Sequence, residues 1–297
     1  MSLALPPRGW TTRFAPAPTG YLHLGHVVNA IWVWGTALAG GGRVLLRVED
    51  HDRARCRADY ARALHEDLAW LGFEADGEVV RQSERGAIYE RHLARLAAAG
   101  RVYPCLCTRR EIVEGGGEGE GEGEELRYPG TCRERAIDPA TTPIRRVRLD
   151  REEIAFVDLM LGPQRQVPAE QCGDLLARDR DGSWTYQFAV AVDDLEQGVD
   201  LVLRGEDLLA STGRQIQLAR LLGRVDPPRF LHHGLLRRAD GTKLSKANRD
   251  EGVRELRAAG WTPGRVLGAA AYAAGLAANG RELAVADLAE AVATRAS

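Results

Sequence analysis

Apolar residues recur with strand or helix spacing through the first hundred residues of the chain. Thr11–Ala15 and the alternating run Arg43–Val48 have the spacing of strands. Helices are expected where apolar positions recur every three to four residues, at Val27–Ala39, Asp59–Leu71 and Glu84–Ala99, with Gly100 as a cap. This order of elements predicts the opening of a nucleotide-binding α/β unit.

The second half of the chain continues the pattern less regularly. Strands are expected within Arg145–Phe156, and the stretch from Leu175 through Asp193 is expected to return to the main sheet. Ser211–Leu222 has helical spacing, and Phe230–Leu236 follows as a strand. Helical spacing returns from Asp250 to Ala278.

The composition is that of an ordinary soluble protein. With 44% hydrophobic and 28% charged residues, 297 residues suffice for one large α/β domain with small appendages. The amino terminus lacks the apolar core of a signal peptide, and no apolar run reaches the roughly 18 residues of a membrane span. We therefore expect a cytoplasmic protein without membrane contact.

The net charge of −2 gives no sign of a nucleic-acid partner, because proteins that neutralise many phosphates usually carry a basic excess. A local patch would escape this test. Arg145, Arg146 and Arg148 form one basic cluster, which is either such a patch or an ordinary arginine-rich surface.

A turn with two histidines stands between the first strand and the first helix. Gly20 and Gly25 let the backbone approach a ligand closely, and a helix beginning near Val27 directs unpaired N–H groups at the turn. Hydrogen bonds and the helix dipole favour anions such as phosphates there. His23 and His26 lie one helical turn apart, so each can donate to a phosphate oxygen. The alternative is a purely structural turn.

A second short loop holds every lysine of the chain. Lysine and arginine total 40, yet the only lysines are Lys243 and Lys246. Their compact, mobile ammonium groups suit phosphates that move during a reaction better than a planar guanidinium does. The alternative is a chance pair on a solvated turn.

These two stretches resemble, in this order, the paired signatures of class I aminoacyl-tRNA synthetases, His-Ile-Gly-His and Lys-Met-Ser-Lys-Ser. Here they read His23-Leu-Gly-His26 and Lys243-Leu-Ser-Lys246. Three further segments resemble the glutamyl branch of that family, namely Arg13-Phe-Ala-Pro-Ala-Pro-Thr-Gly, Arg47-Val-Glu-Asp-His-Asp and Arg204-Gly-Glu-Asp-Leu. The second signature departs from the pattern, because Ala247 stands where the family has its final serine.

The resemblance implies a Rossmann-type class I aminoacyl-tRNA synthetase catalytic domain, with an inserted zinc-containing acceptor-binding subdomain and a short helical carboxyl-terminal region. We expect the first half of the nucleotide-binding domain at 1–100 and the insertion at 101–175. The second half with the lysine loop is expected at 176–248, and a helical stem-contact region at 249–297.

Glutamate is the substrate that the resemblance implies. Glu49 ends a strand, where open α/β sheets bind ligands, and is expected at the substrate amino group. The family places Tyr186 and Arg204 against the glutamate, and a guanidinium can hold a carboxylate by two parallel hydrogen bonds. The alternative is that Arg204 pairs with Glu206 or Asp207 on the surface. The remaining expected contacts are Arg13, Phe14, Ala15, Pro16 and Ala17.

The reaction implied is attack of a carboxylate on the α-phosphorus of ATP, giving glutamyl-adenylate and pyrophosphate, followed by transfer of glutamate to an RNA acceptor. Magnesium is expected with ATP. The protein contributes position and charge. His23, Gly25, His26 and Lys246 are expected at the nucleotide, and the catalytic groups are His23, His26, Lys243 and Lys246.

Three clustered cysteines suit a structural zinc ion. Cys105 and Cys107 can reach one ion, and Cys132 follows Tyr128 by four residues. The residues leave the fourth ligand open among Tyr128, Glu111 and water, and the resemblance implies Tyr128. The alternative is three reduced cysteines without metal, since an acidic glycine-rich run, 114–125, lengthens this module as a flexible loop. Cys56 and Cys172 are expected to be packing residues.

Few residues follow Lys246, fewer than the roughly 100 that a separate anticodon-binding domain would take. The chain is therefore expected to be a catalytic core and a monomer. It resembles the glutamyl-Q tRNA(Asp) synthetases, which attach glutamate to the queuosine base of tRNA(Asp). The alternatives are a truncated glutamyl-tRNA synthetase that charges the 3′ end, and a non-catalytic synthetase paralogue.

Overall fold

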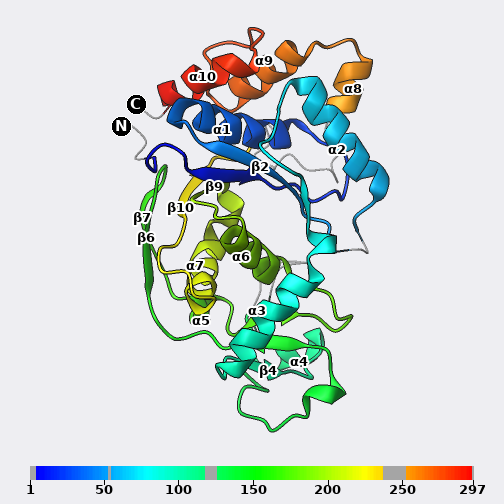
Figure 1. Ribbon diagram of the computed structural model, residues 1–297, viewed down its shortest axis with the longest axis vertical. Coiled ribbons are helices and arrows are strands. Elements are labelled where there is room, and N and C mark those ends of the chain that lie inside the picture. The colour runs from blue at the N-terminus through cyan, green and yellow to red at the C-terminus, as the bar shows by residue number, and fades with distance from the viewer. Residues whose placement is uncertain (1–4, 53–54, 118–125, 237–251, 296–297) are drawn as a thin grey trace.

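The computed structural model describes residues 5–52, 55–117, 126–236 and 252–295 (Figure 1). The strands are β1 Thr11–Phe14, β2 Arg43–Val48, β3 Val80–Arg81, β4 Val102–Pro104, β5 Arg145–Val147, β6 Ile154–Asp158, β7 Gly162–Gln166, β8 Leu175–Arg178, β9 Leu201–Gly205 and β10 Arg229–His233. The helices are α1 Leu24–Gly40, α2 Ala58–Leu71, α3 Gly86–Ala98, α4 Arg109–Glu114, α5 Pro168–Gln171, α6 Tyr186–Glu196, α7 Thr212–Leu221, α8 Val253–Ala258, α9 Pro263–Ala273 and α10 Leu288–Arg295.

Two sets of parallel strands form the centre of the molecule. The first has the order β1-β2-β3, with Thr11 opposite Arg43 and Arg47 opposite Val80. The second has the order β7-β6-β10-β9, in which β10 runs parallel to β6 and β9, and β7 is antiparallel to β6. Asp200 joins the two sets, because its backbone N donates to Thr11 O at 2.8 Å. The α/β fold with a parallel sheet is confirmed.

Helix α1 is the core of the nucleotide-binding unit. Its residues from Val27 to Ala37 are buried except Asn29, as expected for a helix with apolar residues on all sides. It packs against α9 and α10 on one side and against β1, β2 and β9 on the other. Figure 1 shows α8, α9 and α10 as a cap over this end of the molecule. The helical spacing after Asp250 thus corresponds to separate short helices.

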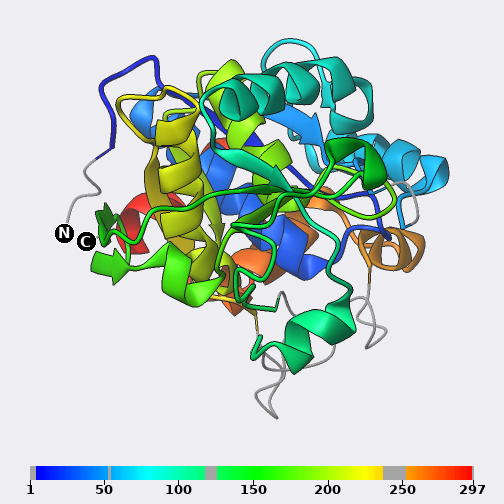
Figure 2. The same ribbon diagram turned by 90° about the horizontal axis from the view of Figure 1, so that it is seen from below.

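The middle of the chain builds a separate antiparallel sheet, β4-β5-β8, with α4 beside it. These elements lie at the opposite end of the molecule from α8, α9 and α10 (Figure 1), and Figure 2 shows the molecule from that end. A small apolar cluster around Tyr103, Tyr128 and Ile144 forms its core. The boundaries at 101 and 175 stay a prediction.

Most of the expected elements are confirmed with small shifts. Arg43–Val48 is a strand over that range, and Gly100, which follows the C-cap of α3, has a left-handed φ of 71°. The expectation for the stretch from Leu175 through Asp193 is wrong, because β8 belongs to the small antiparallel sheet and Tyr186–Glu196 is helix α6. Residues 187–194 are buried on every side, so their apolar run lacks the periodicity that separates a buried helix from a buried strand.

No helix of the described residues is long and apolar enough to cross a membrane.

Candidate active site

A cavity of about 780 Å³ opens at the ends of four strands. It is bounded by β1 and the turn that follows it, by the end of β2, and by the segments after β9 and β10. All of the described residues predicted to bind glutamate or ATP line this cavity, namely Arg13, Phe14, Ala15, Pro16, Ala17, His23, Gly25, His26, Glu49, Tyr186 and Arg204. Lys243 and Lys246 lie outside the described residues.

The two histidines of the turn form the cap of α1. The backbone N of Gly25 donates to His23 Nδ1 at 3.1 Å, and the backbone N of His23 donates to His26 Nδ1 at 3.2 Å. Because both Nδ1 atoms accept, each neutral ring carries its proton on Nε2. The helix therefore begins at Leu24, earlier than expected, and both rings line the cavity with an Nε2–H donor.

Gly25 makes this arrangement sterically accessible. A Cβ atom at Gly25 would lie 2.9 Å from His23 Cε1 and 3.1 Å from His23 Nδ1. Any other residue would push the His23 ring away from the cap. Gly25 thus leaves room for the His23 ring in its capping position and also lets a ligand approach the backbone.

Buried ion pairs surround the glutamate end of the cavity. Arg13 Nε and Arg47 Nη1 both donate to Asp194 Oδ1, at 3.1 and 2.7 Å. Arg47 Nη2 donates to Glu49 Oε1 at 3.1 Å. Arg47 is fully buried, and Arg85 lies 2.6 Å from the next carboxylate, Asp193. Arg13, Arg47 and Arg85 are thus each paired with a carboxylate.

Burial and charge shift the pKa values of this network in opposite directions. Burial raises the pKa of Glu49, although Arg47 and Arg13 oppose the shift. Burial also disfavours the Asp194 carboxylate, but Arg13 and Arg47 outweigh it and lower its pKa. Asp194 therefore stays charged between the two arginines.

Arg204 is the last residue but one of β9, lines the cavity and is 3% exposed. Its side chain hydrogen-bonds to Thr212, Gln215 and His232. The alternative that Arg204 pairs with Glu206 or Asp207 on the surface is therefore wrong. Tyr186, the first residue of α6, lines the cavity with Arg204, and its burial raises the pKa of its hydroxyl.

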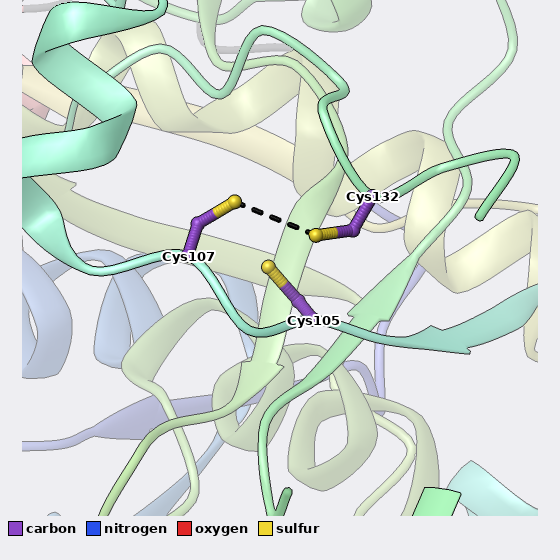
Figure 3. A group of neighbouring side chains, drawn as sticks. All are labelled: Cys105, Cys107 and Cys132. Carbon is purple, nitrogen blue, oxygen red and sulfur yellow. Dashed lines mark hydrogen bonds between the residues drawn. The ribbon is translucent and has the colours of Figure 1, made fainter. Parts of the chain in front are cut away.

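Cys105, Cys107 and Cys132 form a second cluster, in the small antiparallel subdomain. Their sulfur atoms all lie within 4.8 Å of one another, and Figure 3 shows them pointing toward one point. The hydroxyl oxygen of Tyr128 lies 3.4 Å from Cys105 Sγ and 3.7 Å from Cys107 Sγ. Four donors around one tetrahedral Zn²⁺ with bonds of about 2.3 Å have similar separations. The cluster fits a structural zinc site.

The cluster already favours one thiolate. Burial disfavours the charge on Cys132, but hydrogen bonds from the Leu106 backbone and from Tyr128 outweigh it and lower its pKa to about 7. Burial raises the pKa of Cys107 to about 11. Glu111 is engaged elsewhere, since its carboxylate accepts from Thr108 N at 2.7 Å and caps α4.

Tyr128 reaches the cluster because a glycine lets its backbone pass. A Cβ atom at Gly173 would lie 2.0 Å from Tyr128 O, and Gly173 has a φ of +69°. The backbone N of Tyr128 donates to Cys172 O at 2.9 Å. Cys172 itself packs in the core beside α3 and α6, and neither it nor Cys56 belongs to the described metal-binding group.

The family model for the catalytic domain of class I tRNA synthetases (E and Q) matches residues 10–272. The chain belongs to this family. The family resemblance of the five motifs is thus confirmed.

Individual relatives of this class I synthetase cover most of its length. The glutamyl-Q tRNA(Asp) synthetase of Symbiobacterium thermophilum is 46% identical over 280 residues, which are 89% of this chain and 86% of that protein. Glutamate–tRNA ligase 2 of Alkalilimnicola ehrlichii is 42% identical over 88% of this chain, but the match spans only 58% of that protein.

The same fold is found in a solved structure. A glutamate tRNA ligase from Elizabethkingia meningosepticum, in complex with its amino acid, superposes with a TM-score of 0.77 at 26% identity. The match covers 95% of this chain and 64% of the solved chain, so this class I synthetase spans less than two thirds of that protein.

The site of this class I synthetase contains further residues, and the sequence did not indicate two acids among them, Asp194 and Asp158. His233 lines the cavity, stacks on Trp32 at an interplanar angle of 4° and lies 3.1 Å from Asn29 Oδ1. Asp194 and Asp158 carry no motif, because their partners are remote in sequence. A buried acid within an apolar helix, as in α6, was the available signal for Asp194.

The basic cluster predicted as a candidate RNA patch is engaged within the synthetase. Arg146 is 6% exposed and donates to Asp174 O at 3.0 Å. Arg145 donates to the backbone oxygen of Thr142, and Arg148 donates to Glu134 at 2.8 Å. These contacts favour a structural role for the cluster.

Proposed function

We propose that this protein activates L-glutamate with ATP and transfers the glutamyl group to the queuosine base of tRNA(Asp). The observation that best supports this function is that one cavity is lined both by the buried arginines Arg13 and Arg204 and by the histidine turn. The named activity of the Symbiobacterium relative, at 46% identity over most of both chains, supports the choice of acceptor.

The cavity can hold glutamate by its three charged groups. Arg204 and Tyr186 take the side-chain carboxylate, and Glu49 takes the ammonium group. The α-carboxylate then faces the histidine turn, where it attacks the α-phosphorus of ATP and pyrophosphate leaves. Because buried ion pairs hold Arg47, Glu49 and Asp194 in place before substrate arrives, little reorganisation of these side chains accompanies the reaction.

The histidine turn is proposed to stabilise charge on the phosphates. The Nε2–H groups of His23 and His26, together with the amides at the start of α1, are donors for phosphate oxygens. Magnesium accompanies ATP, and Lys243 and Lys246 complete the catalytic set. We propose that Cys105, Cys107, Cys132 and Tyr128 hold one structural zinc ion.

The decisive experiment incubates the protein with labelled glutamate, ATP and magnesium, using tRNA(Asp) with or without queuosine, or tRNA(Glu). Label is expected only on queuosine-containing tRNA(Asp). Labelling of queuosine-free tRNA(Asp), or of tRNA(Glu), would overturn the proposed acceptor.

A matched pair of variants tests the site itself. Arg204→Lys keeps the charge but loses the planar fork, so kcat/KM for glutamate is expected to fall by about tenfold to hundredfold. Arg220→Lys, at an exposed position paired with Glu152, should leave it unchanged.

A second acceptor has one observation in its favour. The Alkalilimnicola relative, named glutamate–tRNA ligase 2, is 42% identical over 88% of this chain. An enzyme of that kind charges the 3′ end of tRNA, and the same assay with tRNA(Glu) distinguishes it from the leading proposal.

A further inference from the structure

Arg204 is held from behind by three buried side chains. Its Nε donates to His232 Nε2 at 3.0 Å, its Nη1 to Gln215 Oε1 at 2.7 Å and its Nη2 to Thr212 Oγ1 at 2.8 Å. All three partners are at most 6% exposed. Every nitrogen of the guanidinium is therefore anchored to the protein.

The number of donors that remain matches a carboxylate. A guanidinium has five N–H donors, one on Nε and two on each terminal nitrogen. One donor on each nitrogen of Arg204 is used. The three anchors leave one N–H on Nη1 and one on Nη2, which is the number that a bidentate carboxylate accepts. The side chain of Tyr186 also hydrogen-bonds to the guanidinium, so an incoming carboxylate shares these donors with the Tyr186 hydroxyl. The anchors thus fix both the plane of the fork and its unused donors.

The strand register places His232 beside Arg204. Arg204 on β9 is paired with His232 on the parallel strand β10. Strand β6 lies on the other side of β10, with Asp158 opposite Phe230. Arg204 and His232 therefore lie in one row across the sheet, and Asp158 follows on the next strand, opposite the residue two positions before His232.

Asp158 determines which nitrogen of His232 accepts. Its Oδ2 lies 2.6 Å from His232 Nδ1, and its Oδ1 accepts from the backbone N of Met160 and Leu161 at 3.0 and 2.9 Å. A carboxylate held by these amides accepts, so Nδ1 of His232 carries the proton. Nε2 is then a lone pair, as a bond from the guanidinium of Arg204 requires.

Other groups around His232 agree with this tautomer. Thr212 Oγ1, which accepts from Arg204, lies 3.3 Å from His232 Nε2 and can donate its own proton there. Burial lowers the pKa of His232, and Arg204 adds to this shift, so the neutral ring is favoured. Hydrogen bonds from His232 and from the backbone outweigh burial and lower the pKa of Asp158.

We propose that Asp158 and His232 are positioning residues for glutamate, which act through Arg204 by fixing the two N–H donors that receive the side-chain carboxylate. This inference rests on the proposed activation of glutamate. It assigns a role to two residues that do not line the cavity themselves.

Two substitutions of His232 separate its two hydrogen bonds. In His232→Asn the amide nitrogen can replace Nδ1 as donor to Asp158, but no acceptor remains for Arg204. In His232→Gln the amide oxygen can replace Nε2 as acceptor. His232→Asn is expected to raise the Kd for glutamate about tenfold to hundredfold, and His232→Gln to restore most of that loss.

Asp158→Asn provides a test that keeps the volume of the side chain. An amide nitrogen at this position donates to Nδ1, which moves the proton of His232 to Nε2, against the N–H of Arg204. The Kd for glutamate should rise about tenfold, although Asp158 and His232 do not contact the ligand themselves. His65→Asn, on α2 and away from the cavity, is the control and should bind as the wild type does.

The measurements are glutamate binding by calorimetry and the KM values for glutamate and ATP. The inference is supported if the Kd and KM for glutamate rise while the KM for ATP and the melting temperature stay unchanged. Equal binding by wild type, His232→Asn and Asp158→Asn overturns it, as does a parallel loss of glutamate and ATP together with a lower melting temperature. A wild type that binds no glutamate would instead overturn the proposed function.

Discussion

The glutamate end of the cavity and the cysteine cluster are both buried and both built from ionisable groups, but their charges are balanced differently. At the glutamate end, Arg47 faces Asp193, Asp194 and Glu49, and Asp194 is shared with Arg13. In the cluster, three thiols and a phenol face one another, and one cation, Arg146, lies 3.6 Å from the centre of the Tyr128 ring.

The difference indicates which of the two sites needs a metal ion to offset its charges. Ion pairs formed during folding keep the glutamate end ready for its substrate. The cluster instead crowds four weak acids, whose ionised forms repel one another unless a cation joins them. Side chains that ion pairs already hold in place can position a ligand, whereas a group of acidic donors that lacks ion-pair partners is suited to a metal ion.

The largest expected effect concerns the cluster. Cys105→Ser should reduce bound zinc from about one ion per chain to almost none, because structural zinc sites rarely survive loss of a thiolate. Structural zinc contributes on the order of 10 kcal/mol of folding free energy in small zinc domains, so the melting temperature should also fall. Zinc is measured by elemental analysis after gel filtration.

The comparison predicts that glutamate binding survives this change, since the glutamate end needs no metal. Cys56→Ser is the matched control and should retain zinc. A Cys105→Ser protein with full zinc content, or a wild type without zinc, would contradict the assignment.

The next effect concerns the ion pairs. Asp194→Asn leaves Arg13 and Arg47 with a weaker partner in a buried site, and we expect a loss of about 3–5 kcal/mol in the free energy of unfolding. Urea denaturation measures it. Asp59→Asn, which removes an exposed partner of Arg62, should change stability by less than about 0.5 kcal/mol. A similar small change for Asp194→Asn would show that the network is not needed for the fold.

The smallest effect concerns Asp67, a buried carboxylate whose charge is only partly offset by nearby arginines. Asp67 on α2 is fully buried, and neither of its carboxylate oxygens has a hydrogen-bond partner among the described residues. Burial raises its pKa to about 6, although Arg254 and Arg257 oppose the shift. Asp67→Asn should therefore stabilise the protein by about 1–3 kcal/mol at pH 7.5.

The gain should shrink at low pH. Because the folded pKa of Asp67 lies above its usual value of 3.8, the folded state takes up a proton as pH falls through 6 and becomes more stable relative to the unfolded state. Denaturation at pH 7.5 and pH 5 measures this. Glu78→Gln, at an exposed position that does not act on Asp67, is the control, and destabilisation by Asp67→Asn at both pH values would contradict the interpretation.

The predictable part of the site was local in sequence. The spacing of apolar residues locates the turn that holds His23 and His26 and the strand end that holds Glu49. Strand β2 has the predicted bounds. The partners of these residues were not predictable. Nothing in the spacing of α6 indicates that Asp194 meets Arg13, or that Asp158 lies beside His232, because these contacts depend on the packing of remote strands.

The same limit explains the error at α6. An amphipathic helix or strand is recognised by the contrast between its faces, and residues 187–194 have no exposed face. Cys105, Cys107 and Cys132 could be grouped because cysteines are rare in the chain, whereas the approach of Tyr128 depends on the turn at Gly173.

The bond between Arg13 and Asp194 spans 181 positions, which has a consequence for how the protein is made. A ribosome adding about 5–20 residues per second needs on the order of ten seconds or more to synthesise that interval. During this time Arg13 and Arg47 have been made but their shared carboxylate has not. Closing so long a loop is only slightly harder than closing a shorter one, since each doubling of length adds about 0.6 kcal/mol. Glutamate binding should therefore be among the last properties that the newly made chain acquires, and a sensitive marker of completed folding.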